Sequence, residues 1–497
     1  MFENIILGLN TIVDPLNLVY VLFGVTIGIT VGAMPGLTST MGAALVLPFT
    51  FFLEPIPAIA MLSALYCGAI YGGSISAILI NTPGTGAAAI TTLDGYELTR
   101  QGEAGKALGV AVVASSLGGL FSVFVLMLVA PQVAKIAISF GAPEYFALSF
   151  FGISMVVNLK TGEELKNIIG GLFGIFISTV GIDAMTGYQR FTFNNTDLMN
   201  GISFIPVMIG LFAATEFYRQ SERTVARSIV HLENISKLPS IIEFWSLRWT
   251  ILRSAIIGTF IGILPAEGGT VSSFISYNEA KRWSKNPEKF GTGILEGVAA
   301  PEAANNAATG GAMIPTMTLG IPGSSTTAVI LGGLMIQGMR PGPLLFTSQP
   351  KFVYSVFVAM FIANIFFLIL GLFGAKVFAQ VGKIPLYILN PIILVLCFVG
   401  SFSLNNNVAD VWIMVIAGFS GYFMKKVGFS GIPIALGMIL GEIIEVSFRQ
   451  TGTLFDNNFA VFFTRPYSAV FMFLAIISLL WPIIIRKISL KKNSSDV

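Results

Sequence analysis

The sequence predicts an all-α polytopic membrane protein made of two inverted repeats with discontinuous helices. Of its 497 residues, 54% are hydrophobic and 11% charged, whereas a soluble chain carries about a quarter charged residues. Windows of about 20 apolar residues, each long enough to cross a bilayer, recur along the chain. In each half of the chain, two of these apolar regions are interrupted by Pro and Gly, and the interruptions follow in the same order in both halves. These features exclude a soluble globular protein.

The clearest interruption lies within Thr309–Gln337, "TGGAMIPTMTLGIPGSSTTAVILGGLMIQ". Pro322 lacks a backbone N–H and disfavours helix at the preceding residue, and Gly323 stabilises no helix. We therefore expect one helix to end near Leu319 and another to begin near Ser324. A broken helix at membrane depth is tolerated where its backbone is buried in protein or lines a watery cavity. The new helix N-terminus is suited to binding a carboxylate.

The same pattern occurs earlier in the chain. "NTPGTGAAAI" at Asn81–Ile90 matches "GIPGSSTTAVI" at Gly320–Ile330, and "GVTIGITVGAMPGLTST" at Gly24–Thr40 matches "GTFIGILPAEGGTVSS" at Gly258–Ser273. Paired interruptions in corresponding halves are typical of the binding site of a secondary transporter. The alternative is that both are packing kinks in a helical bundle, because Pro and Gly are common in membrane helices.

The residues at these interruptions are the candidates for binding an organic carboxylate. None of them is Arg or Lys, so an anion would be held by helix dipoles, hydroxyl groups and a bound cation. Residues 38–40 have the alternative of simply capping the next helix. The candidates are Pro35, Gly36, Thr38, Ser39, Thr40, Asn81, Thr82, Pro83, Gly84, Thr85, Gly86, Pro322, Gly323, Ser324, Ser325, Thr326 and Thr327.

A separate run, "EGVAAPEAANNAA", supplies the candidates for a coupling ion. Helical spacing places Glu302 on one face with Asn305 or Asn306. An acid at membrane depth indicates an ion or proton pathway, and carboxylate and amide oxygens suit Na⁺, which is the only metal expected. The alternative interpretation is that Glu302 lies in the first turn of a helix after an interfacial loop. Glu267 and Thr270, beside the interruption at Pro265, are further candidates.

At these motifs the chain resembles the large membrane subunit of tripartite tricarboxylate transporters, the TctA family. The resemblance rests on "PGLTSTMGAALVLP", "NTPGTGAAAITTLDGY" and "GVAAPEAANNAATGGAMIPTMTLGIPGSSTTAVILGGL", and it covers nearly the whole chain. It implies a secondary transporter of the bacterial inner membrane that imports carboxylates on a Na⁺ or H⁺ gradient, without a cofactor. It also implies two partners, a small membrane subunit and a periplasmic solute-binding protein that delivers the substrate.

Two other classes of function remain as alternatives, an uncoupled anion channel and a membrane-embedded enzyme. Against an enzyme, neither H-E-x-x-H nor G-x-S-x-G occurs, and the only histidine, His231, lies in a polar linker. The net charge of +3 indicates no nucleic-acid partner, because the basic residues lie in short loops as membrane topology requires.

The organisation follows from the interruptions and the loop charges. Lys and Arg favour cytoplasmic loops, so we expect the linker and the basic C-terminus to be cytoplasmic, which makes the two repeats inverted. We expect 94–106 to be a charged cytoplasmic loop, and Glu445 to pair with Arg449 at i, i+4. The predicted parts are a first repeat (1–217), a linker (218–248), a second repeat (249–450) and an extra helix with a basic tail (451–497).

Overall fold

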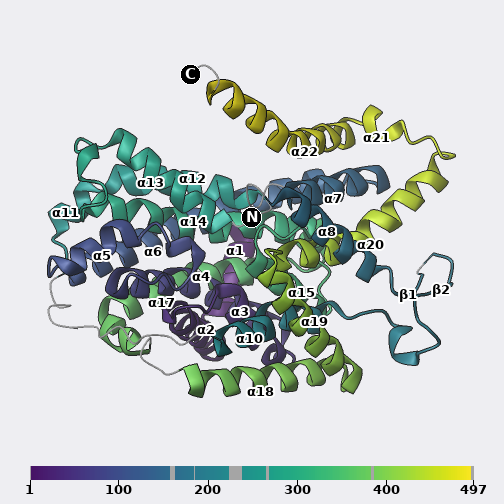
Figure 1. The fold of residues 1–497 in the computed structure, drawn as a ribbon, viewed down its shortest axis with the longest axis horizontal. Helices are drawn as coiled ribbons and strands as arrows, with labels where there is room; N and C mark the ends of the chain where they lie inside the picture. The colour runs from purple at the N-terminus through teal and green to yellow at the C-terminus, as the bar shows by residue number, and fades with distance from the viewer. Residues whose placement is uncertain are drawn as a thin grey trace. The chain divides into compact units, whose positions relative to one another are not determined.

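The computed structural model describes residues 2–156, 163–183, 185–222, 238–264, 268–381 and 386–493, and these are almost entirely helical (Figure 1). Within them, six helices are long and apolar enough to cross a membrane: Pro15–Ala33, Pro55–Ile80, Ala104–Ala137, Pro350–Phe378, Val408–Lys426 and Gly431–Leu454. Shorter apolar helices accompany them. The prediction of an all-α, multi-pass membrane protein is confirmed.

The chain forms two compact units, and each takes segments from both halves of the sequence. The first unit comprises residues 1–135 and 212–406. Its helices are α1 (Phe2–Ile12), α2 (Pro15–Ala33), α3 (Ser39–Thr50), α4 (Pro55–Ile80), η1 (Gly86–Ala88), α5 (Thr92–Arg100), α6 (Ala104–Ala137, up to Lys135), α10 (Thr215–Ser221), α11 (Ile241–Ser246), α12 (Arg248–Ile263), α13 (Gly268–Trp283), η4 (Pro287–Lys289), α14 (Leu295–Leu319), α15 (Ser325–Ile336), α16 (Pro343–Ser348), α17 (Pro350–Val381) and α18 (Leu386–Asn405).

The second unit comprises residues 136–211 and 407–497. A short π-helix, η3 (Ile209–Ala214), spans one boundary between the units. The two strands pair antiparallel, with Gly181 opposite Arg190 and Ile182 opposite Gln189. The elements of this unit are α7 (Ala142–Val156), α8 (Glu164–Ser178), β1 (Gly181–Ile182), β2 (Gln189–Arg190), η2 (Thr196–Leu198), α9 (Phe204–Met208), α19 (Val408–Lys426), α20 (Gly431–Leu454), α21 (Val461–Thr464) and α22 (Pro466–Asn493).

Both long buried helices of the first unit end in the same way. α4 is followed by Asn81 and α14 by Gly320, each in the left-handed conformation (φ 55° and 71°) and two residues before a proline. In each case the N–H of the terminal residue bonds to the carbonyl five residues earlier, Ser76 or Pro315. A left-handed residue before a proline is a common helix stop. The predicted end of the second helix at Leu319 is confirmed.

The helix that packs on each of these two uses glycine at matching places. A Cβ on Gly28 of α2 would overlap the carbonyl oxygen of Leu65 in α4, and a Cβ on Gly258 of α12 would overlap that of Ala304 in α14. One turn later, Gly32 and Gly262 meet the carbonyls of Ala69 and Ala308. Only glycine allows such close helix packing. The pairs α2–α4 and α12–α14 are therefore packed in the same register.

One expectation about a loop is wrong. Residues 94–106 were expected to form a charged loop, but α5 covers Thr92–Arg100 and α6 already begins at Ala104. The turn between them contains Gly102 with φ +80°. Glu97 and Arg100 of this short helix face outward and pair with each other, whereas Asp94 and Leu98 on its inner face are buried.

Candidate functional site

Two helix N-termini from opposite halves of the sequence meet in the first unit. Ser39 and Thr40 begin α3, and Ser325 and Thr326 begin α15. The Thr40 and Ser325 hydroxyl oxygens are 2.7 Å apart, the Ser39 and Thr326 oxygens 2.8 Å, and the Thr40 and Thr326 oxygens 3.1 Å. We call these four residues the hydroxyl bridge. It joins the interruption at Pro35 and Gly36 in the first half to the one at Pro322 and Gly323 in the second.

Neighbouring hydroxyl residues cap the two helices. The Thr38 side chain accepts a hydrogen bond from the Met41 N–H (3.2 Å) at the start of α3. At α15, Ser324 and Thr327 form a capping box in which each side chain accepts from the other's backbone N–H. Capping satisfies N–H groups that have no partner inside the helix. The capping alternative therefore holds for Thr38, whereas Ser39 and Thr40 reach across to the other half.

The turn before α3 depends on a glycine. Gly36 has φ +91°, and its carbonyl accepts a hydrogen bond from the Gln220 side chain of α10 (3.3 Å). Pro35 and Gly36 are half-buried beside Leu37, which is fully buried. A residue with a Cβ would be strained at this φ. Pro35 and Gly36 therefore set the direction in which the chain enters α3, but they offer no side-chain hydrogen-bond donor to a ligand.

The interruption after α4 runs close to α2. The Gly84 N–H bonds to the Gly73 carbonyl (3.3 Å), and a Cβ on Gly84 would overlap the carbonyl oxygen of Gly32. Asn81 and Thr82 are exposed, Pro83 is half-buried, and Thr85 is 5% exposed. Among these polar side chains only Thr85 points into the interior. In the second half, Pro322 and Gly323 are buried, and a Cβ on Gly323 would lie 2.7 Å from the Ala312 Cα.

A second crossing contact joins η1 to the start of α13. The Ser273 hydroxyl donates to the Ala87 carbonyl (2.8 Å), and a Cβ on Gly86 would lie 3.1 Å from the Thr270 hydroxyl oxygen. A Cβ on Gly269 would similarly lie 3.4 Å from the Ala87 Cβ. Thus α3 contacts the interruption of the second half, while α13 contacts the interruption of the first.

Glu302 lies beyond the first two turns of α14 and is completely buried. One carboxylate oxygen accepts a hydrogen bond from the Thr91 hydroxyl (2.6 Å), and the other accepts from Ser115 of α6 (3.0 Å). The alternative that Glu302 occupies the first turn of an interfacial helix is therefore wrong. Two hydroxyl donors stabilise a carboxylate away from water, but they supply no compensating charge.

The two asparagines after Glu302 differ. The Asn306 amide donates to the Cys67 backbone carbonyl in α4 (3.1 Å), and the Cys67 sulfur lies 3.9 Å from the Thr309 hydroxyl. Asn305 is 0% exposed and makes no hydrogen bond of normal length from either amide atom to a described residue, although its side chain interacts with the Glu302 carboxylate. The Asn306 amide oxygen and the Thr85 hydroxyl also lack partners among the described residues. Such buried, unpaired polar atoms are rare in native proteins.

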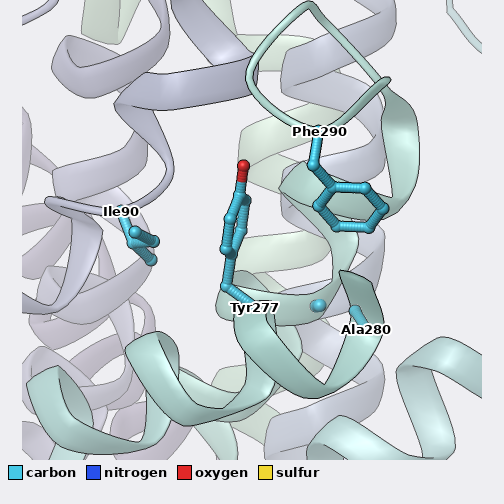
Figure 2. Packing of buried hydrophobic residues seen from close by; sticks show 5 residues of the cluster. Ile90, Tyr277, Ala280 and Phe290 are labelled. Carbon is cyan, nitrogen blue, oxygen red and sulfur yellow. The ribbon is translucent and has the colours of Figure 1, made fainter. Parts of the chain in front are cut away.

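A clamp near the start of α14 also joins the two halves. One oxygen of Asp94 in α5 accepts from the backbone N–H groups of Gly291, Gly293 and Ile294 (2.9–3.0 Å). The other accepts from the Tyr277 hydroxyl (2.8 Å). Figure 2 shows the Tyr277 ring standing between Ile90 and Phe290, with its hydroxyl pointing away from α13. The Asp94 carboxylate thus fixes the loop that leads into the helix carrying Glu302.

Several of these residues were not foreseen. Cys67 and Ser115 lie in apolar helices, Thr91 directly before α5, and Asp94 in the segment that was expected to be a loop, and no local pattern distinguishes them. Asn364, an amide within the apolar helix α17, gave the only usable signal, because polar residues at membrane depth are costly. Its side-chain amide donates to the Met360 backbone carbonyl (2.7 Å), and its backbone carbonyl accepts from the Ser116 hydroxyl. Glu267 and His231 lie outside the described residues.

A family comparison identifies the chain. The family model described as "Tripartite tricarboxylate transporter TctA family" matches residues 18–436, which include every interruption and Glu302. The chain belongs to the TctA family. It is therefore a tricarboxylate transporter subunit and not an enzyme, and membership of a tripartite family implies further subunits.

Two curated relatives, both from Agrobacterium vitis, are similar to this TctA chain. "Uncharacterized 52.8 kDa protein in TAR-I ttuC' 3'region" is 37% identical over 469 residues, which cover 94% of this chain and 93% of that protein. "Uncharacterized protein in TAR-II ttuC' 3'region" is 38% identical over 220 residues, or 44% of this chain and 91% of that protein. No solved structure matches the chain.

Proposed function

We propose that this TctA chain is the translocating subunit of a secondary transporter that imports an organic tri- or dicarboxylate across the bacterial inner membrane. A Na⁺ or H⁺ gradient drives the import. A periplasmic solute-binding protein delivers the substrate, and a small membrane subunit completes the assembly. The observation that carries the proposal is the hydroxyl bridge, where two helix N-termini from opposite halves converge inside an apolar unit. Converging helix N-termini favour an anion.

We propose that the carboxylate occupies the hydroxyl bridge. The hydroxyls of the hydroxyl bridge bond to one another, so an arriving carboxylate exchanges neutral hydrogen bonds for charge-assisted ones. Thr85 and Gly86 extend this surface on the first-half side. With no Arg or Lys at either interruption, the anion is held weakly enough to be released.

The two halves of the first unit act as inverted repeats in this proposal. The matched glycine contacts of α2–α4 and α12–α14 support it. The contact of Asn306 with Cys67 also supports it. Asn306 lies two residues after Ala304, and Cys67 two residues after Leu65, the residues on which the matching glycines pack. The two are therefore equivalent positions, and equivalent positions touch where they lie on a two-fold axis. Inverted repeats place the site near the bilayer midplane and allow alternating access. The C-terminus is cytoplasmic on this arrangement.

Glu302 with Asn305 and Asn306 holds or senses the coupling ion in the proposed mechanism. Glu302 is charged or neutral depending on whether a cation or a proton accompanies the substrate. Thr270 lines the second crossing contact, and Glu267 is adjacent to it in sequence.

The test is uptake of labelled citrate and a panel of other carboxylates into proteoliposomes that contain the chain with its small subunit and binding protein. Saturable accumulation that needs a Na⁺ or pH gradient is the expected result. A carboxylate flux that does not saturate as its concentration rises, and that needs neither a Na⁺ nor a pH gradient, would mean an uncoupled anion channel. No uptake of any carboxylate with both partners present would overturn the proposal.

A further inference from the structure

The two halves of the first unit differ at one pair of equivalent positions. Tyr66 directly follows the α4 residue on which Gly28 packs, and Asn305 directly follows the α14 residue on which Gly258 packs. Ser324 and Thr85 each directly follow the glycine of an interruption, Gly323 and Gly84. Tyr66 with Ser324, and Asn305 with Thr85, are therefore equivalent pairs, each joining a long helix to the interruption of the other half.

In one of these pairs the two side chains are hydrogen-bonded to each other. The Tyr66 hydroxyl lies 3.1 Å from the Ser324 hydroxyl, and the Tyr66 side chain is 3% exposed. The phenol ring fills the space between α4 and the start of α15, and its polar tip has a partner. Nothing is left there for a ligand to satisfy.

In the equivalent pair the side chains are buried but not hydrogen-bonded to each other. The Thr85 hydroxyl and both amide atoms of Asn305 make no hydrogen bond of normal length within the described residues, although the Asn305 side chain interacts with the Glu302 carboxylate; the two side chains are 5% and 0% exposed. Leaving such groups buried and unpaired costs about 1–3 kcal/mol each. Asn reaches less far than Tyr, so it cannot close the gap to Thr85 as Tyr66 closes the gap to Ser324. Gly269 of α13 lies against both segments, since a Cβ on it would be 3.4 Å from the Ala87 Cβ and 3.9 Å from the Asn305 backbone carbonyl oxygen. Buried polar atoms without hydrogen bonds at these equivalent positions indicate a missing ligand.

The charge nearby selects the kind of ligand. Glu302 precedes Asn305 by three residues, which places both on one face of α14. The carboxylate is held by Thr91 and Ser115, which carry no charge, so no described ion pair neutralises it. A cation near Asn305 is attracted to Glu302, whereas an anion is repelled. Hydroxyl and amide oxygens are suitable ligands for a dehydrated alkali cation.

We infer that Asn305 and Thr85 bind one monovalent cation of the size of Na⁺, and that Tyr66 blocks the equivalent position, so that the chain has a single such site rather than a symmetric pair. This inference rests on the proposed cation coupling. It specifies that each chain has one cation site and that Tyr66 prevents a second.

The test is equilibrium binding of ²²Na⁺ to the purified full chain in lipid nanodiscs, with choline keeping the ionic strength constant. We expect one Na⁺ per wild-type chain. Thr85→Val, which removes one oxygen and keeps the shape, should weaken binding about tenfold or more. Asn305→Tyr, which copies the hydrogen-bonded pair, should abolish it.

Two variants serve as controls. Thr30→Val removes a hydroxyl that bonds only within its own helix, to the Thr26 carbonyl, and should leave binding unchanged. Tyr66→Phe removes the hydroxyl but keeps the ring, so the number of bound ions should stay at one. Two ions on the wild-type chain, none, or unchanged affinity in Thr85→Val would each overturn the inference.

The outcomes also separate this inference from the proposed function. Gradient-driven carboxylate uptake by the wild type together with unchanged ²²Na⁺ binding in Thr85→Val refutes the site and leaves the transporter intact. Specific ²²Na⁺ binding that Thr85→Val weakens, with no carboxylate uptake under any gradient, supports the site and refutes the transporter proposal.

Discussion

The hydroxyl oxygens of Thr40 and Ser325 lie 2.7 Å apart, although 285 positions separate the two residues in the chain. Their pairing brings together the N-termini of α3 and α15, the two restarted helices of opposite halves. Because hydroxyls that bond to each other can rotate to bond an anion, the pair is both a structural contact and a ready set of donors.

Removing one of these hydroxyls tests its part in substrate binding. Thr40→Val keeps the side-chain shape and deletes one donor to the bound carboxylate, and a hydrogen bond to a charged group contributes about 1.5–3 kcal/mol. We expect the KM for carboxylate uptake to rise about tenfold or more. The matched control is Thr26→Val, since that hydroxyl bonds only to the Leu22 carbonyl of its own helix. An unchanged KM in Thr40→Val places the substrate elsewhere.

The close approach of the first interruption to α2 predicts a folding defect. The Cβ of Gly84→Ala would overlap the Gly32 carbonyl oxygen, a backbone atom that cannot move aside as a side chain can. Overpacking costs about 1–3 kcal/mol and more where backbone must shift. We expect a lower Tm and less monodisperse protein in detergent. Gly171→Ala is the comparison, because its Cβ would meet its neighbours at 3.9 and 4.0 Å, in ordinary contact. Equal behaviour of the two variants would contradict the packing described.

The Asp94 clamp predicts a graded loss of stability. Asp94→Ala leaves three backbone N–H groups and the Tyr277 hydroxyl without their acceptor, at about 1–3 kcal/mol for each group that stays buried. Asp94→Asn keeps one carbonyl oxygen for the N–H groups and should be milder. Tyr277→Phe loses a single bond and should be mildest. Thermal unfolding of the three purified variants measures the order, and a reversed order would contradict the clamp.

An ion-pair network in the second unit predicts a pH dependence. The Arg449 guanidinium, together with the Met185 and Thr186 N–H groups, holds the pKa of Asp183 below its usual range. A lowered pKa stabilises the fold above the unfolded value of about 3.9, and this contribution is lost as the pH falls through the folded pKa. Asp183→Asn should therefore lower the Tm at pH 7, and the difference from wild type should shrink below about pH 4.

A second aspartate provides the control for that measurement. Asp14 caps α2 by accepting from the Leu16 N–H, and asparagine caps equally well. Asp14→Asn should leave the Tm near the wild-type value at every pH. If Asp183→Asn behaves in the same way, the network contributes nothing to stability. The network itself includes the predicted pair of Glu445 with Arg449, confirmed at 3.2 Å, and adds Arg190 of the hairpin.

Local chemistry explains what could be predicted from the sequence. The ends of α4 and α14 follow from Pro83 and Pro322, whose effects on the backbone need no tertiary information. The interruptions at Pro35 and Pro322 were expected to lie close together because each recurs in the other half, a pattern typical of a transporter's binding site. The pairing of Thr40 with Ser325 was not predicted. Partners that depend on packing could not be predicted. Ser115 and Thr91 contact Glu302 only because α6 and the segment before α5 pass beside α14, and nothing in their own surroundings marks them.

Cross-linking the hydroxyl bridge tests the central claim most directly. In a chain with Cys67→Ala and Cys397→Ala, the double variant Thr40→Cys and Ser325→Cys places two sulfurs where hydroxyls now lie 2.7 Å apart, within reach of a disulfide. We predict that oxidation abolishes carboxylate uptake, that a reductant restores it, and that a transported carboxylate slows the cross-linking. Full uptake by the cross-linked chain, or a cross-linking rate that no transported carboxylate changes, would contradict a substrate site between the two interruptions.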